Sequence, residues 1–214
     1  MRVGVTKAVL VAMDQKRPPI WRFAIFAFLL FVGGCMQDDP RYASFTDDGH
    51  RLPPVPISNL SGEFHRHEIE YKSEYKPGTI VVDTNTKFLY LVMPNRKAMR
   101  YGIAVGGEAY SWKGHARVAQ MKKWPVWTPP SDMIKREPEL AQYAGGVEPS
   151  IANPLGARAL YLFNGKGDTG YRIHGTPEWT SIGRAKSSGC IRMINQDVID
   201  LYDRVELGAT VIVL

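Results

Sequence analysis

Residues 170–193 read GYRIHGTPEWTSIGRAKSSGCIRM, and this stretch holds a histidine and a cysteine 16 residues apart, each beside a glycine. The aromatic and β-branched content of Gly170–His174 predicts a strand that ends at His174. Apart from Cys35, Cys190 is the only cysteine in the chain. A thiol is a weak nucleophile until it ionises, so its pKa of about 8.5 must fall through a partner such as an imidazole. The stretch therefore makes acyl transfer through a thioester a candidate chemistry.

Both residues also have a purely structural interpretation. A lone cysteine is often a small buried hydrophobe, and a histidine on a strand is often a satisfied core residue. The neighbouring glycines favour the catalytic interpretation, because Gly175 and Gly189 would let the backbone and a substrate approach closely. The amides of Gly189 and Cys190 could also face a developing oxyanion. On spacing alone, both interpretations stay open.

The segments around this stretch predict a mainly β architecture with a few short helices. Apolar runs bounded by turn residues indicate strands, and apolar residues at helical spacing after Asn195 indicate a helix of about ten residues capped by Asn195. Residues 106–157 are less regular, and three tryptophans there, Trp112, Trp124 and Trp127, could form a lid or part of the core. The expected strands are 79–83, 87–93, 98–105, 158–163, 170–174 and 210–214. The expected helices cover 131–143, with Ser131 or Asp132 as its cap, and a segment that starts at 195.

Composition excludes several broad classes of protein. Hydrophobic residues make up 44% and charged residues 22%, which is globular rather than disordered. The sequence has one long apolar run and two cysteines, so neither a polytopic membrane protein nor a disulfide scaffold fits. The net charge of +6 arises largely in the first 34 residues, and without them 22 basic residues face 20 acidic ones. A nucleic-acid partner is therefore not expected.

The N-terminus is typical of an export signal. Basic residues precede the apolar run FAIFAFLLFV at 23–32, which is followed by Gly33-Gly34-Cys35. This order resembles a bacterial lipoprotein signal, and the resemblance implies lipidation of Cys35 after removal of residues 1–34. It also implies a periplasmic protein anchored to a membrane, with the outer membrane favoured over the inner one. An ordinary cleaved signal and an uncleaved anchor are the alternatives.

Residues 35–77 are polar and proline-rich, and we interpret them as a lipidated N-terminus and tether that precede a domain over 78–214. The tether itself is expected to run to about residue 60, and the segment from there to Pro77 could pack on the domain surface. As a tether to about residue 60, the segment would span roughly 25 to 80 Å. His65 and His67 could form half of a metal site, but no matching cysteine or carboxylate pattern accompanies them, so solvated histidines are favoured. We expect no metal and no cofactor.

The motifs of residues 78–214 resemble those of the YkuD-type L,D-transpeptidases. The matching residues are His174-Gly-Thr, then Ser187-x-Gly189-Cys190-Ile-Arg192-Met, then Asn195-x-Asp197, preceded by Asn153-Pro-Leu-Gly. Many members carry histidine immediately before the Gly-Cys pair, where this chain has Ser188. The resemblance implies a mixed β-sandwich with the catalytic cysteine on a strand near a groove.

The same resemblance implies a mechanism. Cys190, with His174 as base, would attack the carbonyl that joins the third residue of a peptidoglycan tetrapeptide stem, usually meso-diaminopimelate, to its terminal D-alanine. The Gly175 carbonyl would orient the imidazole. Arg192 would bind a substrate carboxylate, since on a strand it faces the same side as Cys190. Gly189, Ser188 and Ser187 would line the oxyanion or substrate site.

Peptidoglycan stems are thus the expected partners. The thioester would pass to an amine, which gives a 3→3 cross-link if the amine belongs to another stem and wall attachment if it belongs to a protein. The alternatives are transfer to water, which trims the wall, and a non-catalytic lipoprotein that only binds stems.

Overall fold

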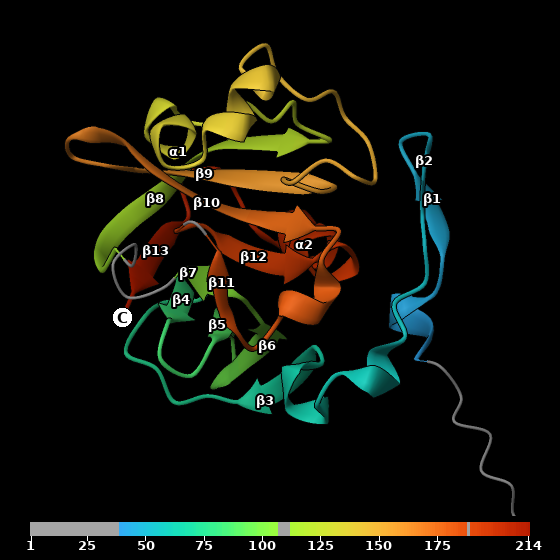
Figure 1. Cartoon of the computed structure of the whole chain (residues 1–214). Coiled ribbons are helices and arrows are strands. Elements are labelled where there is room, and N and C mark those ends of the chain that lie inside the picture. The colour runs from blue at the N-terminus through green and yellow to red at the C-terminus, as the bar shows by residue number, and fades with distance from the viewer. Residues whose placement is uncertain (1–38, 107–111, 188) are drawn as a thin grey trace, which may run out of the picture. The chain divides into compact units, whose positions relative to one another are not determined.

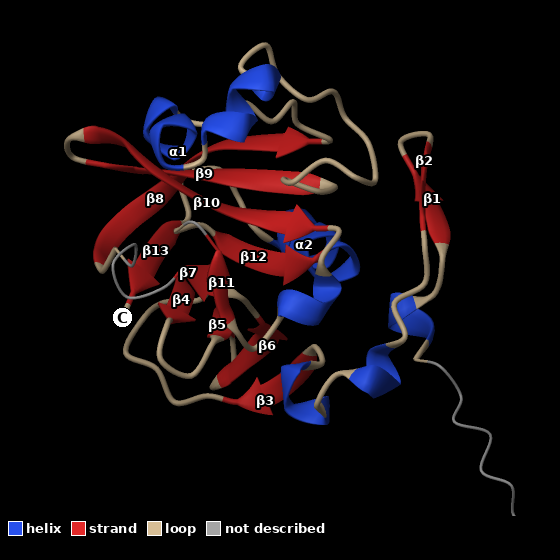
Figure 2. Cartoon of the chain, in the orientation of Figure 1, coloured by secondary structure: helices blue, strands red, loops and turns tan. Residues whose placement is uncertain are grey.

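The computed structural model describes residues 39–106, 112–187 and 189–214. Within these ranges, nine strands form one mixed sheet with the order β12-β10-β9-β8-β13-β4-β5-β6-β3 (Figures 1 and 2). The β10–β12 and β4–β13 pairs are parallel, and the other pairs are antiparallel. The strands are β3 (His67–Glu70), β4 (Ile80–Asp83), β5 (Phe88–Met93), β6 (Lys97–Gly102), β8 (Gly114–Lys123), β9 (Arg158–Asn164), β10 (Gly167–Thr176), β12 (Ile191–Ile194) and β13 (Thr210–Val213).

Strands from both halves of this sheet contribute to the main core cluster. Fully buried side chains from β4, β5 and β6 share a cluster with those of β9, β10, β12 and the helix α2 (Asn195–Arg204). A long sheet that buries one face in a common core packs as two layers. The mainly β prediction is confirmed, as is the helix that begins at Asn195. Members of the cluster include Ile80, Leu89, Tyr101, Leu160, Ile173, Met193, Val198 and Leu201.

The β4–β5 hairpin forms where turn chemistry predicts it. The Oδ1 atom of Asp83 accepts hydrogen bonds from the backbone N–H groups of Asn85 and Thr86, at 2.9 and 3.1 Å. Lys87 closes the turn with a φ of 62°. An aspartate that accepts from the amides after it is a common way to fix such a turn. The register of the hairpin places Val82 opposite Leu89, and both are fully buried.

The region that looks irregular in sequence contains the long strand β8. Its register on β9 shifts between Val118 and Gln120. A bulge of this kind breaks the alternation of buried and exposed residues by which a strand is found in sequence. Two short strands nearby, β7 (Val105–Gly106) and β11 (Ala185–Ser187), pair with each other in parallel.

The helix predicted over residues 131–143 is two helices. The α-helix α1 (Ser131–Arg136) ends before Pro138, and the 3-10 helix η5 (Pro138–Tyr143) follows. Proline lacks the N–H that would continue an α-helix and restricts the residue before it. The predicted cap at Ser131 or Asp132 is wrong, because Pro130 holds that position without a side-chain cap. No helix in the described ranges has the length and apolar character needed to cross a membrane.

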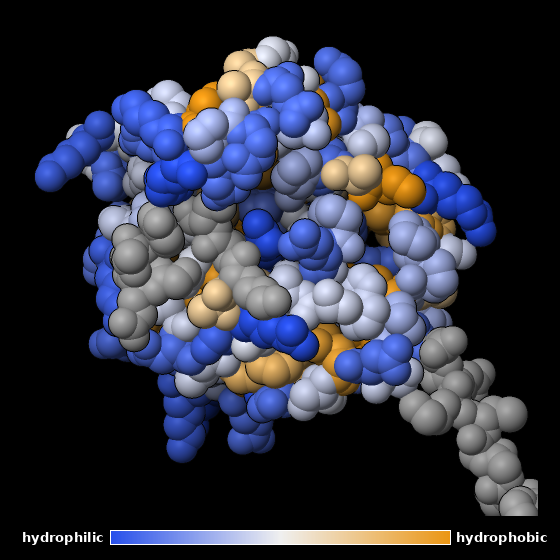
Figure 3. Space-filling view, viewed as in Figure 1, coloured by the Kyte–Doolittle hydropathy of each residue, from blue (hydrophilic) through white to orange (hydrophobic). Residues whose placement is uncertain are grey.

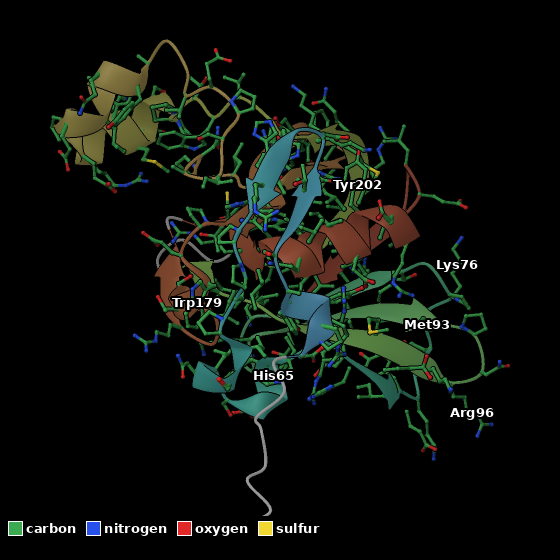
Figure 4. The ribbon with its side chains drawn as sticks, turned by 90° about the vertical axis from the view of Figure 1, so that its right-hand side faces the viewer. His65, Lys76, Met93, Arg96, Trp179 and Tyr202 are labelled. Atoms are coloured by element: carbon green, nitrogen blue, oxygen red, sulfur yellow. The ribbon has the colours of Figure 1, made fainter. Side chains whose placement is uncertain are left out.

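Residues 39–66 form an arm that packs on the domain, which differs from the expected tether. The hairpin of β1 (Phe45–Asp47) and β2 (His50–Leu52) lies beside α2 (Figures 1 and 4). Tyr42 and Leu52 are each only 1% exposed. The arm also includes the 3-10 helices η1 (Pro40–Tyr42), η2 (Ile57–Asn59) and η3 (Gly62–Phe64).

Charged and aromatic groups fasten the hairpin of the arm to the domain. The carboxylate of Asp47 accepts hydrogen bonds from both terminal nitrogens of Arg158, at 2.7 and 2.9 Å. It also accepts one from Nε1 of Trp124, at 2.7 Å. The Trp124 ring stacks on His50 at a centroid distance of 4.0 Å. Since the Arg158 side chain is only 2% exposed, Asp47 is the countercharge of a buried cation.

A second group of contacts joins the start of the arm to α2. The hydroxyl of Tyr42 accepts a hydrogen bond from the backbone N–H of Arg66 and donates one to Oδ2 of Asp197, at 2.8 and 3.3 Å. The Arg66 guanidinium lies 3.0 Å from Asp200. Burial raises the pKa of Asp197 to about 7, against the opposing effects of Arg66 and Tyr42. The arm therefore covers a buried carboxyl at the start of α2.

Candidate active site

Two adjacent parallel strands bring His174 and Cys190 to the same face of the sheet. In the β10–β12 register, Ile173 lies opposite Ile191 and His174 opposite Arg192. Ile173 and Ile191 point into the core. Side chains alternate along a strand, so His174 and Arg192 face the other way, and Cys190, two residues before Arg192, shares that face. Cys190 lies one residue before β12 rather than within it, which corrects the prediction of a cysteine on the strand.

The imidazole of His174 is held in one tautomer. Its Nδ1 atom lies 2.6 Å from the carbonyl oxygen of Gly175. A carbonyl only accepts hydrogen bonds, so Nδ1 carries the proton and Nε2 of the neutral ring is left as an acceptor. This is the contact that the resemblance implied for Gly175. Burial lowers the pKa of His174 to about 4, the bond to Gly175 opposes this, and the charges of Arg192 and Arg172 add to it.

The pKa of the Cys190 thiol is raised, whereas the sequence predicts that it is lowered. Cys190 is half-buried and forms no disulfide. Burial raises the pKa of its thiol, while a backbone hydrogen bond from Arg172 and the charges of Arg172 and Arg192 lower it by less. With a raised thiol pKa and a lowered imidazole pKa, the pair rests in its neutral form near pH 7. A thiol in this state could attack a carbonyl only if an acceptor such as Nε2 of His174 took its proton at the same time.

The backbone before Cys190 has the conformation of a tight turn. Gly189 adopts a φ of 123°, a region that residues with a side chain rarely enter. This conformation lets the chain bend between β11 and β12, so the Cys190 amide follows a turn rather than a regular strand. The predicted site residue Ser187 pairs through its backbone with Gly106. Ser188 and Cys35 lie outside the described residues.

His174 and Cys190 line one cavity of about 280 Å³. Arg192 lies on the same wall, where its Nη1 atom is 3.0 Å from Oε2 of Glu178. The α1–η5 segment contributes further lining residues, among them Met133 and Leu140. Figure 3 shows this face hollowed below the α1–η5 segment, with hydrophilic residues around the hollow. The cavity thus brings together a thiol, a neutral imidazole and a guanidinium, a set of groups that could transfer an acyl group from an anionic peptide.

Asn195 has a role different from the predicted helix cap. It is the first residue of α2, and Ile194 holds the cap position without a side-chain bond. The Oδ1 atom of Asn195 accepts from the backbone N–H of Ala157, and its Nδ2 atom donates to the carbonyl of Thr176, at 2.9 and 3.1 Å. A Cβ on Gly175 would lie 2.1 Å from that Oδ1 atom. Asn195 therefore fixes the end of β10 just beyond His174.

The three tryptophans of the irregular region lie in different places. Trp127 lines the cavity, whereas Trp112 packs on Tyr171 and Trp124 is 6% exposed beneath the arm. Trp124 is therefore the core tryptophan of one predicted alternative, and a lid that includes Trp127 stays a prediction. Glu178 is a cavity residue that sequence reasoning missed. The only feature of the sequence that points to Glu178 is its position four residues after His174. That spacing alone does not show that the chain turns after Thr176 and brings the Glu178 carboxylate next to Arg192.

His65 and His67, the candidate half of a metal site, each contact nearby backbone carbonyls. The Nε2 atom of His65 lies 3.0 Å from the carbonyls of Ile57 and Leu60, and that of His67 lies 3.0 Å from the carbonyl of Gly62. Across the described ranges, no group of three or more histidine, cysteine or acidic side chains could hold a metal ion.

Comparison with known proteins agrees with the geometry. Residues 77–213 match the family model YkuD, described as an L,D-transpeptidase catalytic domain. Escherichia coli "Probable L,D-transpeptidase YbiS" is 34% identical over 211 residues, which cover 95% of this chain and 62% of YbiS. The chain thus spans less than two thirds of that relative. A Fuscovulum blasticum protein, provisionally named L,D-transpeptidase in ATP synthase subunits region ORF 5, is 28% identical over 76% of this chain and 82% of its own length.

A solved structure from Brucella melitensis is also similar. It is 45% identical with a TM-score of 0.50, and the match covers 74% of this chain and 98% of that one. The name of that protein is "Probable carnitine operon oxidoreductase caia", which refers to a different activity.

Proposed function

The chain belongs to the YkuD family of L,D-transpeptidase catalytic domains, and we propose that it transfers peptidoglycan stem peptides through a thioester on Cys190. One observation carries this proposal. His174 and Cys190 lie on the same face of β10 and β12 in one cavity, and the Gly175 carbonyl holds the imidazole with Nε2 as the acceptor.

The first half of the reaction forms the thioester. Sγ of Cys190 attacks the carbonyl carbon between the third residue and the terminal D-alanine of a tetrapeptide stem, and its proton passes to Nε2 of His174. The amide nitrogen of D-alanine takes that proton as the C–N bond breaks. D-Alanine leaves, and the stem remains on Cys190. The positive charges of Arg172 and Arg192, which already act on the thiol, stabilise the negative charge that develops beside it.

The second half releases the stem to an acceptor. An amine attacks the thioester carbonyl and gives a proton to His174, and the departing sulfur of Cys190 takes a proton back. An amine on a second stem gives a 3→3 cross-link, and an amine on a protein ties that protein to the wall. In both halves Arg192 binds a carboxylate of the donor stem, after it separates from Glu178.

Intact-protein mass spectrometry tests the nucleophile directly. Purified protein is incubated with disaccharide-tetrapeptide, and both the adduct mass and the released D-alanine are measured. Wild-type protein and the exposed control Glu206→Gln should carry the stem minus D-alanine. Cys190→Ala should carry no adduct and should release D-alanine at least about 10³-fold more slowly. D-Alanine release by Cys190→Ala at the wild-type rate would overturn the proposal.

The products of the same incubation identify the acceptor. Dimeric muropeptides indicate transfer to a stem, and adducts with an added wall-attached protein indicate transfer to that protein. Shortened monomers alone would mean that water is the acceptor and would contradict transfer to an amine. Comparison of sacculi from cells that express wild-type protein or Cys190→Ala extends the measurement to the intact wall.

We also propose that the protein is exported and anchored in the periplasm by a lipid on Cys35. The support is the sequence alone, in which basic residues, the apolar run 23–32 and Gly33-Gly34 precede that cysteine. A Cys35→Ala variant should move from the membrane fraction to the soluble fraction or remain unprocessed with its N-terminus intact. Membrane partition of a fully processed Cys35→Ala protein would refute the lipid anchor.

A further inference from the structure

The cavity wall holds an ion pair in which one partner, Glu178, has no role in the thioester chemistry described above. Nη1 of Arg192 lies 3.0 Å from Oε2 of Glu178, and both residues line the cavity that contains Cys190. The Arg192 side chain is 21% exposed, and the Glu178 side chain is 69% exposed. An ion pair this open to solvent adds little stability. It can therefore separate at small cost when a charged ligand competes for either partner.

The backbone of Glu178 is held firmly even though its side chain is exposed. Its N–H donates to Oγ1 of Thr176 at 3.1 Å, and its carbonyl accepts from the N–H and the hydroxyl of Ser181 at 2.9 and 2.7 Å. Pro177 restricts the backbone directly before it. The structure thus presents the Glu178 carboxylate from a fixed position at the end of β10.

The charges around the cavity favour a ligand that carries both signs. Glu137 and Glu178 supply two negative charges, and Arg192 supplies a positive one. When a carboxylate of the ligand binds Arg192, it displaces the Glu178 carboxylate. Glu178 is then left without a positively charged partner. An ammonium group next to the bound carboxylate would restore the balance. A ligand with a carboxylate alone would leave Glu178 facing a second negative charge.

We propose that Glu178 is a specificity-determining residue which, with Arg192, forms a subsite for a head group that carries an ammonium and a carboxylate on the same carbon. The inference rests on the proposed function, since the head group would be the free end of a diaminopimelate side chain in the donor stem. Cys190 and Arg192 are two residues apart, and two residues of chain span at most about 7 Å. The short methylene chain between the two amino-acid centres of diaminopimelate covers a similar length.

Binding to a protein that cannot react tests this subsite without relying on turnover. Full-length Cys190→Ala protein is titrated by calorimetry with two tetrapeptide stems. One has a free diaminopimelate head group, and the other is acetylated on its amine. Cys190→Ala protein that retains Glu178 should bind the stem with the free head group about tenfold more tightly than the acetylated stem. This preference should fall as added salt screens the charges. Adding Glu178→Gln should reduce the preference to about onefold, whereas the exposed control Glu206→Gln should retain it.

The direction of each change separates this role from a structural one. Glu178→Gln should bind the acetylated stem as tightly as before or about twofold more tightly, because Arg192 loses its competitor. Equal weakening of both stems would mean that Glu178 only maintains the cavity, and an unchanged tenfold preference would mean that it does not contact the head group. Either result overturns the inference. D-Alanine release by wild-type protein would persist in both cases, so the proposed function is judged separately.

Discussion

The attachment of the arm can be tested at Asp47. Asp47→Asn keeps the shape of the side chain but removes the negative charge that neutralises Arg158. It also places an NH₂ group, which cannot accept a hydrogen bond, next to the N–H donors of Arg158 and Trp124. Removing one partner of a buried ion pair costs about 3 to 5 kcal/mol. Asp47 is 15% exposed and Arg158 only 2% exposed, so the lower end of that range, about 3 kcal/mol, applies. Loss of the Trp124 bond adds about 1 kcal/mol.

The neighbouring residue gives a matched control. Asp48 lies 3.7 Å from Lys123, and both side chains are about half exposed. Asp48→Asn should therefore cost at most about 0.5 kcal/mol. Its φ of 46° is one that asparagine also tolerates. The assay is urea unfolding followed by tryptophan fluorescence, with hydrogen exchange at residues 45–52 to detect local release of the hairpin.

The stabilisation by the Asp47 carboxylate should depend on pH in a defined direction. Burial raises the pKa of Asp47, but the hydrogen bonds from Arg158 and Trp124 outweigh it and hold the pKa below its usual range. The stabilisation is therefore fully present above about pH 4 and is lost as the pH falls further. The difference in the free energy of unfolding between wild type and Asp47→Asn should be constant from pH 6 to 8 and should become smaller below pH 4. If Asp47→Asn and Asp48→Asn agree within about 0.5 kcal/mol in both assays, the reasoning is refuted.

Three further predictions concern the site and the buried carboxyl. Alkylation of Cys190 should still accelerate above pH 9, and activity should fall as His174 gains a proton near pH 4; an alkylation plateau by pH 6 would indicate a preformed thiolate. Because Asp197 has a folded pKa of about 7, above its unfolded value, wild type should lose stability relative to Asp197→Asn as the pH rises from 4 to 7, and parallel stability curves would contradict this. Gly175→Ala should cost at least about 2 kcal/mol in urea unfolding and reduce kcat/KM, since its Cβ would overlap Asn195; an unchanged unfolding midpoint would refute the close contact.

Local sequence patterns predicted the elements whose residues interact with near neighbours. The β4–β5 hairpin follows from Asp83 and the amides directly after it, and α2 follows from apolar residues at helical spacing. The β8 strand was missed because a bulge near Val118 interrupts its alternation. The arm was misread for a different reason, since its buried residues are scattered among prolines and polar residues without a regular period.

The site was predicted to the extent that a motif fixes it. The resemblance implied the partners Cys190 and His174 and the Gly175 carbonyl, but it could not give the direction of the thiol pKa shift, which depends on burial. Asn195 looks like a helix cap in its local sequence, whereas its partners lie as far away as Ala157. Contacts between residues that are distant in the chain leave no local pattern to interpret.

The packing of the arm limits how far the domain could work from a membrane. Since the packed arm begins at Asp39 and η1 at Pro40, a lipid on Cys35 would leave only residues 36–38 to bridge the distance to the bilayer. Three fully extended residues reach about 10 Å, which is below the range of roughly 25 to 80 Å expected for a tether to residue 60. The proposed enzyme would then act on the layer of wall nearest its membrane, and lengthening this linker should widen the zone of wall that it modifies.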